Sequence, residues 1–336
     1  MKKFLVLSLA VILFAAGTYF FLAQRLDYSK IVIVLPSSER ASSLYYYKKD
    51  GDFFLADDLR LGLEKLGYEV SYRFREDYDN LDLGNVGNVI YFKGYYNFKH
   101  LPEAKNDKRK RVLYLYYVEG LEPQILKEVD AVASASEKMI KDMLEPQGVK
   151  AYYIPQFTNP ERFKPVDTEN KITTVLFVGS NNSGKGRQSV DYAVNAKADL
   201  SVYGKFWEKY LERRYLKGTY IDNDELFKYY GSAKIVLNDH REDMRYFGFV
   251  SNRIYDVTAS GGFVLTDYLP EIEAVYGDSV ATYKNEQEFK EKLAYYLTHN
   301  EERQNMARRA REITLKYFTN DVAAQKFDAL LKNIQK

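Results

Sequence analysis

Cysteine is absent from this sequence of 336 residues, and histidine occurs at only three scattered positions. The lack of cysteine excludes disulfides, thiol nucleophiles and cysteine-ligated metals, and the few histidines argue against a histidine-based metal site. A strong charge of either sign is also missing, because the formal net charge is +2. Proteins that bind nucleic acid normally carry a clear basic excess. The sequence therefore predicts a protein without a metal and without a nucleic acid partner.

The composition is that of a folded globular protein. Hydrophobic residues make up 46% and charged residues 29%, a balance that disordered chains lack. The chain is too long for one ordinary core and suits two domains with a small additional segment. Tyrosine is abundant at 31 residues; rings at strand edges explain most of them, and one or two could stack on sugars. The basic run 105–111 is predicted to be a solvated loop, with contact to anionic lipid or substrate as the alternative.

An uncharged apolar stretch at 4–23 follows two lysines near the start of the chain. Its length of about 20 residues matches the hydrocarbon core of a bilayer. A cleavable signal peptide with small residues at 15–17 is the alternative, but the apolar run continues through 18–23 with aromatic rings where an interfacial belt would lie. We therefore predict a retained single-pass membrane anchor. Its orientation stays open, because Arg25 and Lys30 weaken the bias set by the two lysines.

Short apolar runs alternate with helical patterns across 30–156. The helical patterns lie at 55–66, where Gly67 ends the helix, and at 137–144, where Ser136 can cap it. Strands that alternate with helices predict a parallel, doubly wound, Rossmann-like α/β sheet. The expected strands are 30–35, 68–74, 89–92, 112–116, 130–134 and 151–154.

Three prolines within 155–165 cannot belong to a regular element, so the domain boundary is placed there, with a hinge at 157–170. A second Rossmann-like α/β domain is predicted at 171–318, followed by a separate amphipathic helix at 319–336. The expected strands of the second domain are 173–178, 200–203, 235–237 and 263–265, and its expected helices are 224–230, 286–297 and 301–317.

The loop 179–187 (GSNNSGKGR) follows the first strand of the second domain. Small residues let backbone N–H groups approach a phosphate, and the next helix offers its positive end. The spacing is not that of a P-loop, because the lysine is not followed by Ser or Thr. A tight turn without a ligand is the alternative reading. The candidate phosphate-binding residues in this loop are Gly179, Asn181, Gly184, Lys185 and Arg187.

Residues 235–267 carry an unusual number of hydrogen-bonding side chains after one strand. Ligands of open α/β sheets bind beyond the carboxyl ends of the strands, and packing alone does not ask for such a cluster. We therefore expect the floor of the active site here. The candidate residues are Asn238, Asp239 and His240 at the strand end and Ser251, Asn252, Arg253 and Asp256 around the following helix.

Several segments, taken in order, resemble the group-1-like glycosyltransferases of the GT-B fold, closest to the branch with spore-maturation-type glycosyltransferase domains. The resemblance covers almost everything after residue 30. It implies two Rossmann-like domains facing a cleft, with a nucleotide-diphosphate sugar on the second domain, an acceptor site on the first, and a last helix that crosses back. The matching segments are 51–70, 154–165, 175–187, 201–207, 234–267 and 301–319.

The resemblance assigns residue roles unevenly. The wider family carries two glutamates eight positions apart, the second of which touches the donor ribose. Asp256 takes the second place, but Gly248 takes the first, so the usual sugar contact cannot be transferred. Arg253 would neutralise the diphosphate as the leaving group departs, with Asn252 orienting it. Asp239 and His240 would meet a sugar hydroxyl or the acceptor, and they form the predicted catalytic set with Arg253.

Structural roles remain open for the same residues. Arg253 and Asp256 lie three positions apart on one helix and could simply pair with each other. His240 could be a loop residue without chemistry, and Asn238 could cap a strand. Trp207 is predicted to be a packing residue or a wall for the nucleotide base rather than a catalytic group.

The sequence therefore predicts a membrane-anchored glycosyltransferase that moves a sugar from a nucleotide-diphosphate donor to an envelope or surface glycan, or to a lipid-linked acceptor. No cofactor or metal is expected, since helix N-termini and cations can stabilise the diphosphate. Because nucleotide sugars are made in the cytoplasm, the catalytic body is expected there. A catalytically inactive glycan-binding or scaffold protein of the same fold is the first alternative, favoured by the missing glutamate. A sugar-nucleotide epimerase on the same scaffold is the second.

Overall fold

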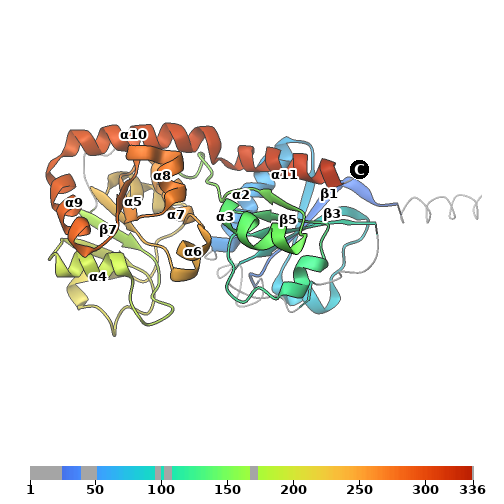
Figure 1. The fold of residues 1–336 in the computed structure, drawn as a ribbon, viewed down its shortest axis with the longest axis horizontal. Coiled ribbons are helices and arrows are strands. Elements are labelled where there is room, and N and C mark those ends of the chain that lie inside the picture. Colours follow the sequence, from blue (N-terminus) through green and yellow to red (C-terminus); the bar gives the residue numbers. More distant parts are fainter. Residues whose placement is uncertain (1–24, 39–50, 95–99, 102–107, 167–172, 335–336) are drawn as a thin grey trace, which may run out of the picture.

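The computed structural model describes residues 25–38, 51–94, 100–101, 108–166 and 173–334, and these form two α/β lobes joined by a linker (Figure 1). The predicted anchor at 4–23 lies outside the described residues. Within the described part of the chain, no helix combines the length and the apolar character that crossing a bilayer needs.

The first domain is a six-stranded parallel sheet in the order β2-β1-β3-β4-β5-β6. Every residue of β3 is buried, as expected for a central strand covered on both faces. The predicted strands of this half are all present, with ends that shift by a few residues. They are β1 (Asp27–Val34), β2 (Glu69–Arg73), β3 (Val86–Lys93), β4 (Lys110–Leu115), β5 (Ala131–Ser134) and β6 (Ala151–Tyr153).

Two predicted helices flank this sheet. Helix α2 (Gly51–Lys65) buries Leu59 and Leu63, but Leu66, which the helical pattern placed inward, is 43% exposed because the helix ends before it. Ser136 caps α3 (Glu137–Met139) by accepting the backbone N–H of Met139 at 3.0 Å, as predicted. The chain then continues in a wider turn at Ile140–Leu144.

The second domain contains another six-stranded parallel sheet, in the order β12-β11-β10-β7-β8-β9. The prediction of two parallel-sheet Rossmann-like domains is therefore confirmed. The strands are β7 (Val175–Val178), β8 (Leu200–Tyr203), β9 (Leu216–Gly218), β10 (Ile235–Asn238), β11 (Val264–Asp267) and β12 (Ala281–Tyr283). The helices are α4 (Gln188–Asn195), α5 (Leu226–Ser232), α6 (Glu242–Phe247), α7 (Asn252–Ala259), α8 (Pro270–Tyr276), α9 (Glu286–Thr298) and α10 (Asn300–Tyr317).

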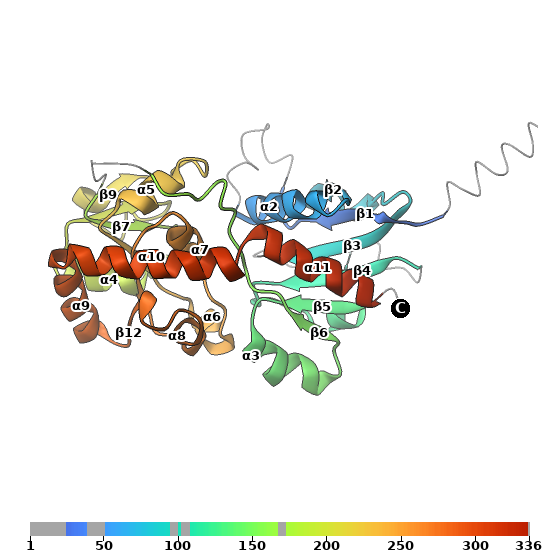
Figure 2. The same ribbon diagram turned by 90° about the horizontal axis from the view of Figure 1, so that it is seen from above.

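The last helix, α11 (Asn320–Ile334), leaves the second domain and lies against the first (Figure 2). Thr158 of the linker fixes the point of return, because its N–H donates to Phe318 O and its carbonyl accepts from Asn320 N, both at 2.9 Å. Beyond that point α11 buries Phe327 and Leu331 in the core of the first domain. The chain therefore crosses between the lobes twice, once in the linker and once at the start of α11.

Candidate functional site

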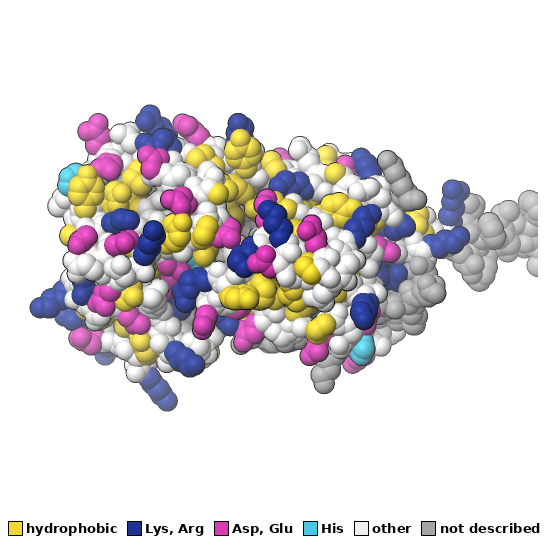
Figure 3. All heavy atoms as spheres, in the orientation of Figure 1, with side chains coloured by type: hydrophobic (Ala, Val, Ile, Leu, Met, Phe, Trp, Pro, Cys, Tyr) yellow, Lys and Arg dark blue, Asp and Glu magenta, His cyan; other side chains and the backbone are white. Residues whose placement is uncertain are grey.

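A cleft of about 1090 Å³ opens beyond the carboxyl ends of β7 and β10. The second domain supplies most of its lining, through the loop after β7 and the segment from Asp239 to Phe247. Val118 and Glu119, which follow β4, form part of the opposite wall. The position agrees with the rule that open α/β sheets bind ligands beyond their strand ends. On the face of the molecule that Figure 3 shows, acidic and basic side chains are interspersed without one dominant patch.

The loop after β7 is shaped by its glycines. Gly184 and Gly186 have φ angles of +70° and +79°, which L side chains rarely adopt. Asn181 Oδ1 accepts the N–H of Gly186 at 3.0 Å, and a side chain at Gly186 would collide with the ring of Tyr210. The loop therefore holds a fixed shape that brings Lys185 to the edge of the cleft.

Asp239 holds Arg187 at the start of α4. Its carboxylate forms an ion pair with the guanidinium of Arg187, which also donates to the carbonyl of Asp239 at 2.7 Å. The other carboxylate oxygen accepts from Ser189, from its N–H at 2.9 Å and from its hydroxyl at 3.1 Å. Asp239 is only 3% exposed, so it is placed to orient Arg187 towards the cleft rather than to react itself.

Arg187 and Arg253 meet at the ring of Phe177. Their guanidinium carbons lie 5.5 Å and 5.1 Å from the ring centre, within the range of cation–π contacts. Arg253 also donates to Asn238 Oδ1 at 2.7 Å and to the carbonyl of Val178, and burial lowers the pKa of its guanidinium. The side-chain oxygen of Asn238 thus accepts a hydrogen bond from Arg253 instead of capping a strand. Two cations are concentrated beside the glycine-rich loop.

His240 is held by the protein through both ring nitrogens. Nδ1 lies 2.6 Å from Asp267 Oδ1, and Nε2 accepts the N–H of Ser251 at 3.0 Å. This pattern fits a neutral imidazole that carries its proton on Nδ1. Burial raises the pKa of Asp267, but the hydrogen bonds that its carboxylate accepts from the ring and the backbone N–H of His240 outweigh burial and hold that pKa below its usual value. The geometry therefore gives His240 a positioning role, fixing Ser251 at the start of α7.

Asp267 was not foreseen as a site residue. The available signal was its place at the end of β11, directly beside the strand end that supplied the other candidates. Arg245 was also missed; it donates to the carbonyl of His240 at 2.7 Å and lies 3.4 Å from Asp267. Both residues support the His240 segment, and their contacts depend on how two strand ends meet.

Asp256 lies at the linker rather than in the wall of the cleft. Its carboxylate accepts from Thr158 Oγ1 at 2.7 Å and from Asn252 Nδ2 at 3.0 Å, and burial raises its pKa to about 7. The alternative pairing of Arg253 with Asp256 is not formed among the described residues. Gly248, where the wider family has a glutamate, has a φ angle of +72°, and a side chain there would collide with Glu271.

The structure brings together some of the predicted residues at the cleft surface. Arg253, Asp256 and Asn252 lie behind that surface. The roles predicted for these three residues, and for the candidates at the cleft surface, remain predictions. Among the described residues, no cluster of three or more acidic or histidine side chains could hold a metal ion. The predicted residues that line the cleft are Lys185, Arg187, Asp239 and His240. Gly179, Asn181 and Gly184 belong to the same loop as Lys185, and Ser251 lies directly before α7.

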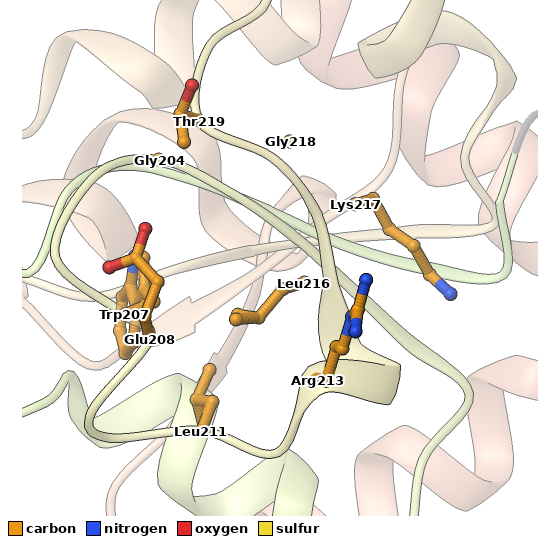
Figure 4. A pocket seen from close by; sticks show the side chains of 9 residues that line it. All are labelled: Gly204, Trp207, Glu208, Leu211, Arg213, Leu216, Lys217, Gly218 and Thr219. Carbon is orange, nitrogen blue, oxygen red and sulfur yellow. The ribbon is translucent and has the colours of Figure 1, made fainter.

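A second hollow, of about 420 Å³, lies beside the turns that follow β8 and β9 (Figure 4). Trp207 forms one wall; its ring is fully buried, and its Nε1–H donates to the carbonyl of Gly179 at 2.7 Å. A side chain at Gly204 would collide with that same carbonyl. Trp207 thus packs the glycine-rich loop from below, which agrees with the packing role predicted for it.

The glycosyl transferase-like family matches residues 187–329, from Arg187 to the middle of α11. The spore protein CgeB of Bacillus subtilis (strain 168) is 30% identical over an alignment of 225 residues, and the match covers 62% of this chain and 69% of that protein. The chain belongs to the CgeB-like glycosyltransferases of the GT-B fold. The family match begins at the arginine that Asp239 orients and includes the whole segment around His240.

Solved structures share the fold of this CgeB-like glycosyltransferase. The sucrose-phosphate synthase of Thermosynechococcus elongatus superposes with a TM-score of 0.67, at 10% identity, over 91% of this chain and 98% of that one. Anabaena Alr3699/HepE, solved with UDP and glucose, superposes with a TM-score of 0.62, at 12% identity, over 90% of this chain and 99% of that one. T4 phage BGT, solved with UDP and Mn2+, superposes with a TM-score of 0.61, at 16% identity, over 91% of this chain and 99% of that one. At these identities the similarity shows the fold alone.

Proposed function

We propose that this glycosyltransferase takes its sugar from a nucleotide-diphosphate donor bound on the second domain. The observation that carries the proposal is Arg187, which faces the cleft at the start of α4 and is oriented by the buried carboxylate of Asp239. Lys185 adds a second cation from the same loop. A diphosphate placed there would receive charge-assisted hydrogen bonds and the positive end of a helix.

The proposed reaction breaks the bond between the anomeric carbon and the β-phosphate oxygen and forms a bond from that carbon to an acceptor hydroxyl, whose proton is released. Negative charge grows on the departing diphosphate, so fixed cations beside it lower the barrier. Arg187 and Arg253 can supply this stabilisation without a metal, and metal independence is part of the proposal. His240 acts by holding Ser251 and the start of α7 in place. Anabaena HepE and T4 phage BGT were both solved with UDP, which supports a nucleotide donor.

The proposed acceptor is an envelope or surface glycan, or a lipid-linked precursor of one. The apolar segment 4–23 would anchor the enzyme beside such an acceptor. Since nucleotide sugars are cytoplasmic, the catalytic body is proposed to face the cytoplasm. A topology reporter fused to the C-terminus tests this, and an extracytoplasmic signal would contradict the proposal.

Calorimetric titration tests the donor site directly. The full-length protein in detergent should bind at least one of UDP, GDP and dTDP. Replacing Arg187 with Gln should weaken binding of that diphosphate about 10-fold or more, because a charge-assisted hydrogen bond is lost, while the free nucleoside binds as before. Arg308→Gln, an exposed arginine on α10, is the matched control and should behave as wild type. Failure of all three diphosphates to bind the wild type would refute the donor proposal.

A further inference from the structure

Arg241 forms a contact across the cleft. It follows β10 directly before α6, and its guanidinium pairs with the carboxylate of Glu119, which belongs to the turn after β4 of the first domain. The guanidinium also lies 5.3 Å from the ring centre of Tyr117 and 3.3 Å from Asp243. Glu119 and Arg241 both line the cleft that contains Lys185 and Arg187. The contact therefore joins the two domains at the proposed donor site.

The position of Glu119 is built into the first domain. Lys93, which is fully buried at the end of β3, donates to the carbonyls of Gly94 at 2.8 Å and Glu119 at 3.0 Å. The hydroxyl of Tyr117 donates to the Glu119 carboxylate at 2.5 Å. These bonds fix both the backbone and the side chain of Glu119. Its contact with Arg241 is thus a defined feature of the cleft.

The cleft arginines differ in how firmly they are held. Arg187 is tied to a buried carboxylate, and Arg245 to a backbone carbonyl and Asp267 within its own domain. Arg241 is 40% exposed and Glu119 is 55% exposed, so water and salt screen their attraction. An exposed pair of this kind changes an equilibrium by at most about 5-fold. A charge-assisted bond to a diphosphate is worth about 10-fold or more and would displace it.

We propose that Arg241 is a further donor-binding residue, which Glu119 holds and then releases to the diphosphate. The inference rests on the proposed nucleotide-diphosphate donor. Before the donor binds, the carboxylate of Glu119 pairs with the guanidinium as an internal anion. When the donor binds, its diphosphate takes over the guanidinium, and the contact between the two domains at this point is lost. Glu119 therefore competes with the donor, and its removal should improve donor affinity.

The test compares diphosphate and nucleoside binding by calorimetry in the full-length protein at low salt. The diphosphate used is whichever of UDP, GDP and dTDP binds the wild type. Arg241→Gln should bind it about 10-fold more weakly, and Glu119→Gln should bind it about 2- to 5-fold more tightly. Neither change should alter the affinity for the nucleoside. In the double variant the gain from Glu119→Gln should vanish, because the released arginine is gone.

Matched controls separate this effect from general changes in charge. Glu122→Gln, an exposed acid three residues further along, and Arg308→Gln on α10 should both bind as wild type. Thermal unfolding confirms that each variant is folded. Wild-type affinity in Arg241→Gln, or weaker binding in Glu119→Gln, would overturn the inference while leaving the donor proposal intact. A wild type that binds none of the diphosphates overturns both.

Discussion

Individual carboxyl groups at the domain junction are buried where their charge is costly. Asp58 of α2 accepts from Asn159 of the linker at 2.8 Å and lies 3.2 Å from Arg162, and burial raises its pKa to about 6. The pKa of Asp256 is likewise raised to about 7, chiefly by burial and in smaller part by the nearby charge of Asp58. The junction therefore contains two acids that titrate close to neutral pH.

This shift predicts a pH dependence of stability at Asp256. The unfolded carboxyl ionises near pH 4, whereas the folded carboxyl stays protonated to about pH 7. Its contribution to the free energy of unfolding is thus complete below about pH 4 and is lost as the pH rises to 7. Between pH 5 and 7 the wild type should lose about 2 kcal/mol relative to Asp256→Asn. Urea unfolding at both pH values measures this difference.

Asp142→Asn is the control for that experiment, since Asp142 lies exposed on the surface and pairs only with Lys138 among its described contacts. The difference between Asp142→Asn and the wild type should stay constant between pH 5 and 7. A constant difference for Asp256→Asn as well would show that Asp256 is ionised in the folded protein.

At the scale of elements, the packing of α2 against α11 depends on one small residue. Gly62 lies in the interior of α2, where alanine would normally be the better helix former. A Cβ at Gly62 would lie 2.7 Å from the carbonyl of Asn320 and 2.8 Å from Cβ of Ala324. The two helices therefore approach so closely that a methyl group has no room.

Gly62→Ala should destabilise the protein by about 1–2 kcal/mol, because the clash between helices outweighs the gain in helix propensity. Urea unfolding at neutral pH measures the change. Gly51→Ala at the start of the same helix meets nothing within 4 Å and should leave stability nearly unchanged. Equal stability of Gly62→Ala and wild type would mean that α11 can shift away from α2 at little cost.

At the scale of the whole molecule, the last segment of the chain completes the core of the first domain. Phe327 of α11 is fully buried, and its ring packs edge-on against Tyr114 of β4 at 5.3 Å. The chain between them includes the last two strands of the first sheet, the linker and the entire second domain. The core of the first domain is therefore complete only when the chain on both sides of the second domain contributes to it.

Phe327→Ala should cost about 3–5 kcal/mol, the usual penalty for a buried phenylalanine. Because Phe327 packs only into the first core, the loss should be local to that domain. Hydrogen exchange should show weaker amide protection in β3 and β4 and unchanged protection in β7 and β10. Gln325→Ala, on the exposed side of α11, serves as the control. Uniform loss of protection in both sheets would show instead that the two domains unfold as one unit.

The sequence by itself determined most of the elements, although β9, β12, α6 and α8 were not predicted. Buried strands such as β3 appear as continuous apolar runs, and Ser136 caps its helix through a contact three residues away, so both follow from local physics. The glycines of the loop 179–187 also marked a backbone of special shape. The ends of α2 were less certain, because Leu66 matched the apolar spacing but fell beyond the last turn.

Only the tertiary structure decided what the polar side chains do. His240 bonds to Asp267 across 27 positions, Asp256 to Thr158 across 98, and Arg241 to Glu119 across 122. No local pattern specifies such partners, because they depend on how strand ends and whole domains meet. The sequence thus placed a candidate site at the end of β10, and the structure shows which of the candidate residues face the cleft and which lie behind its surface.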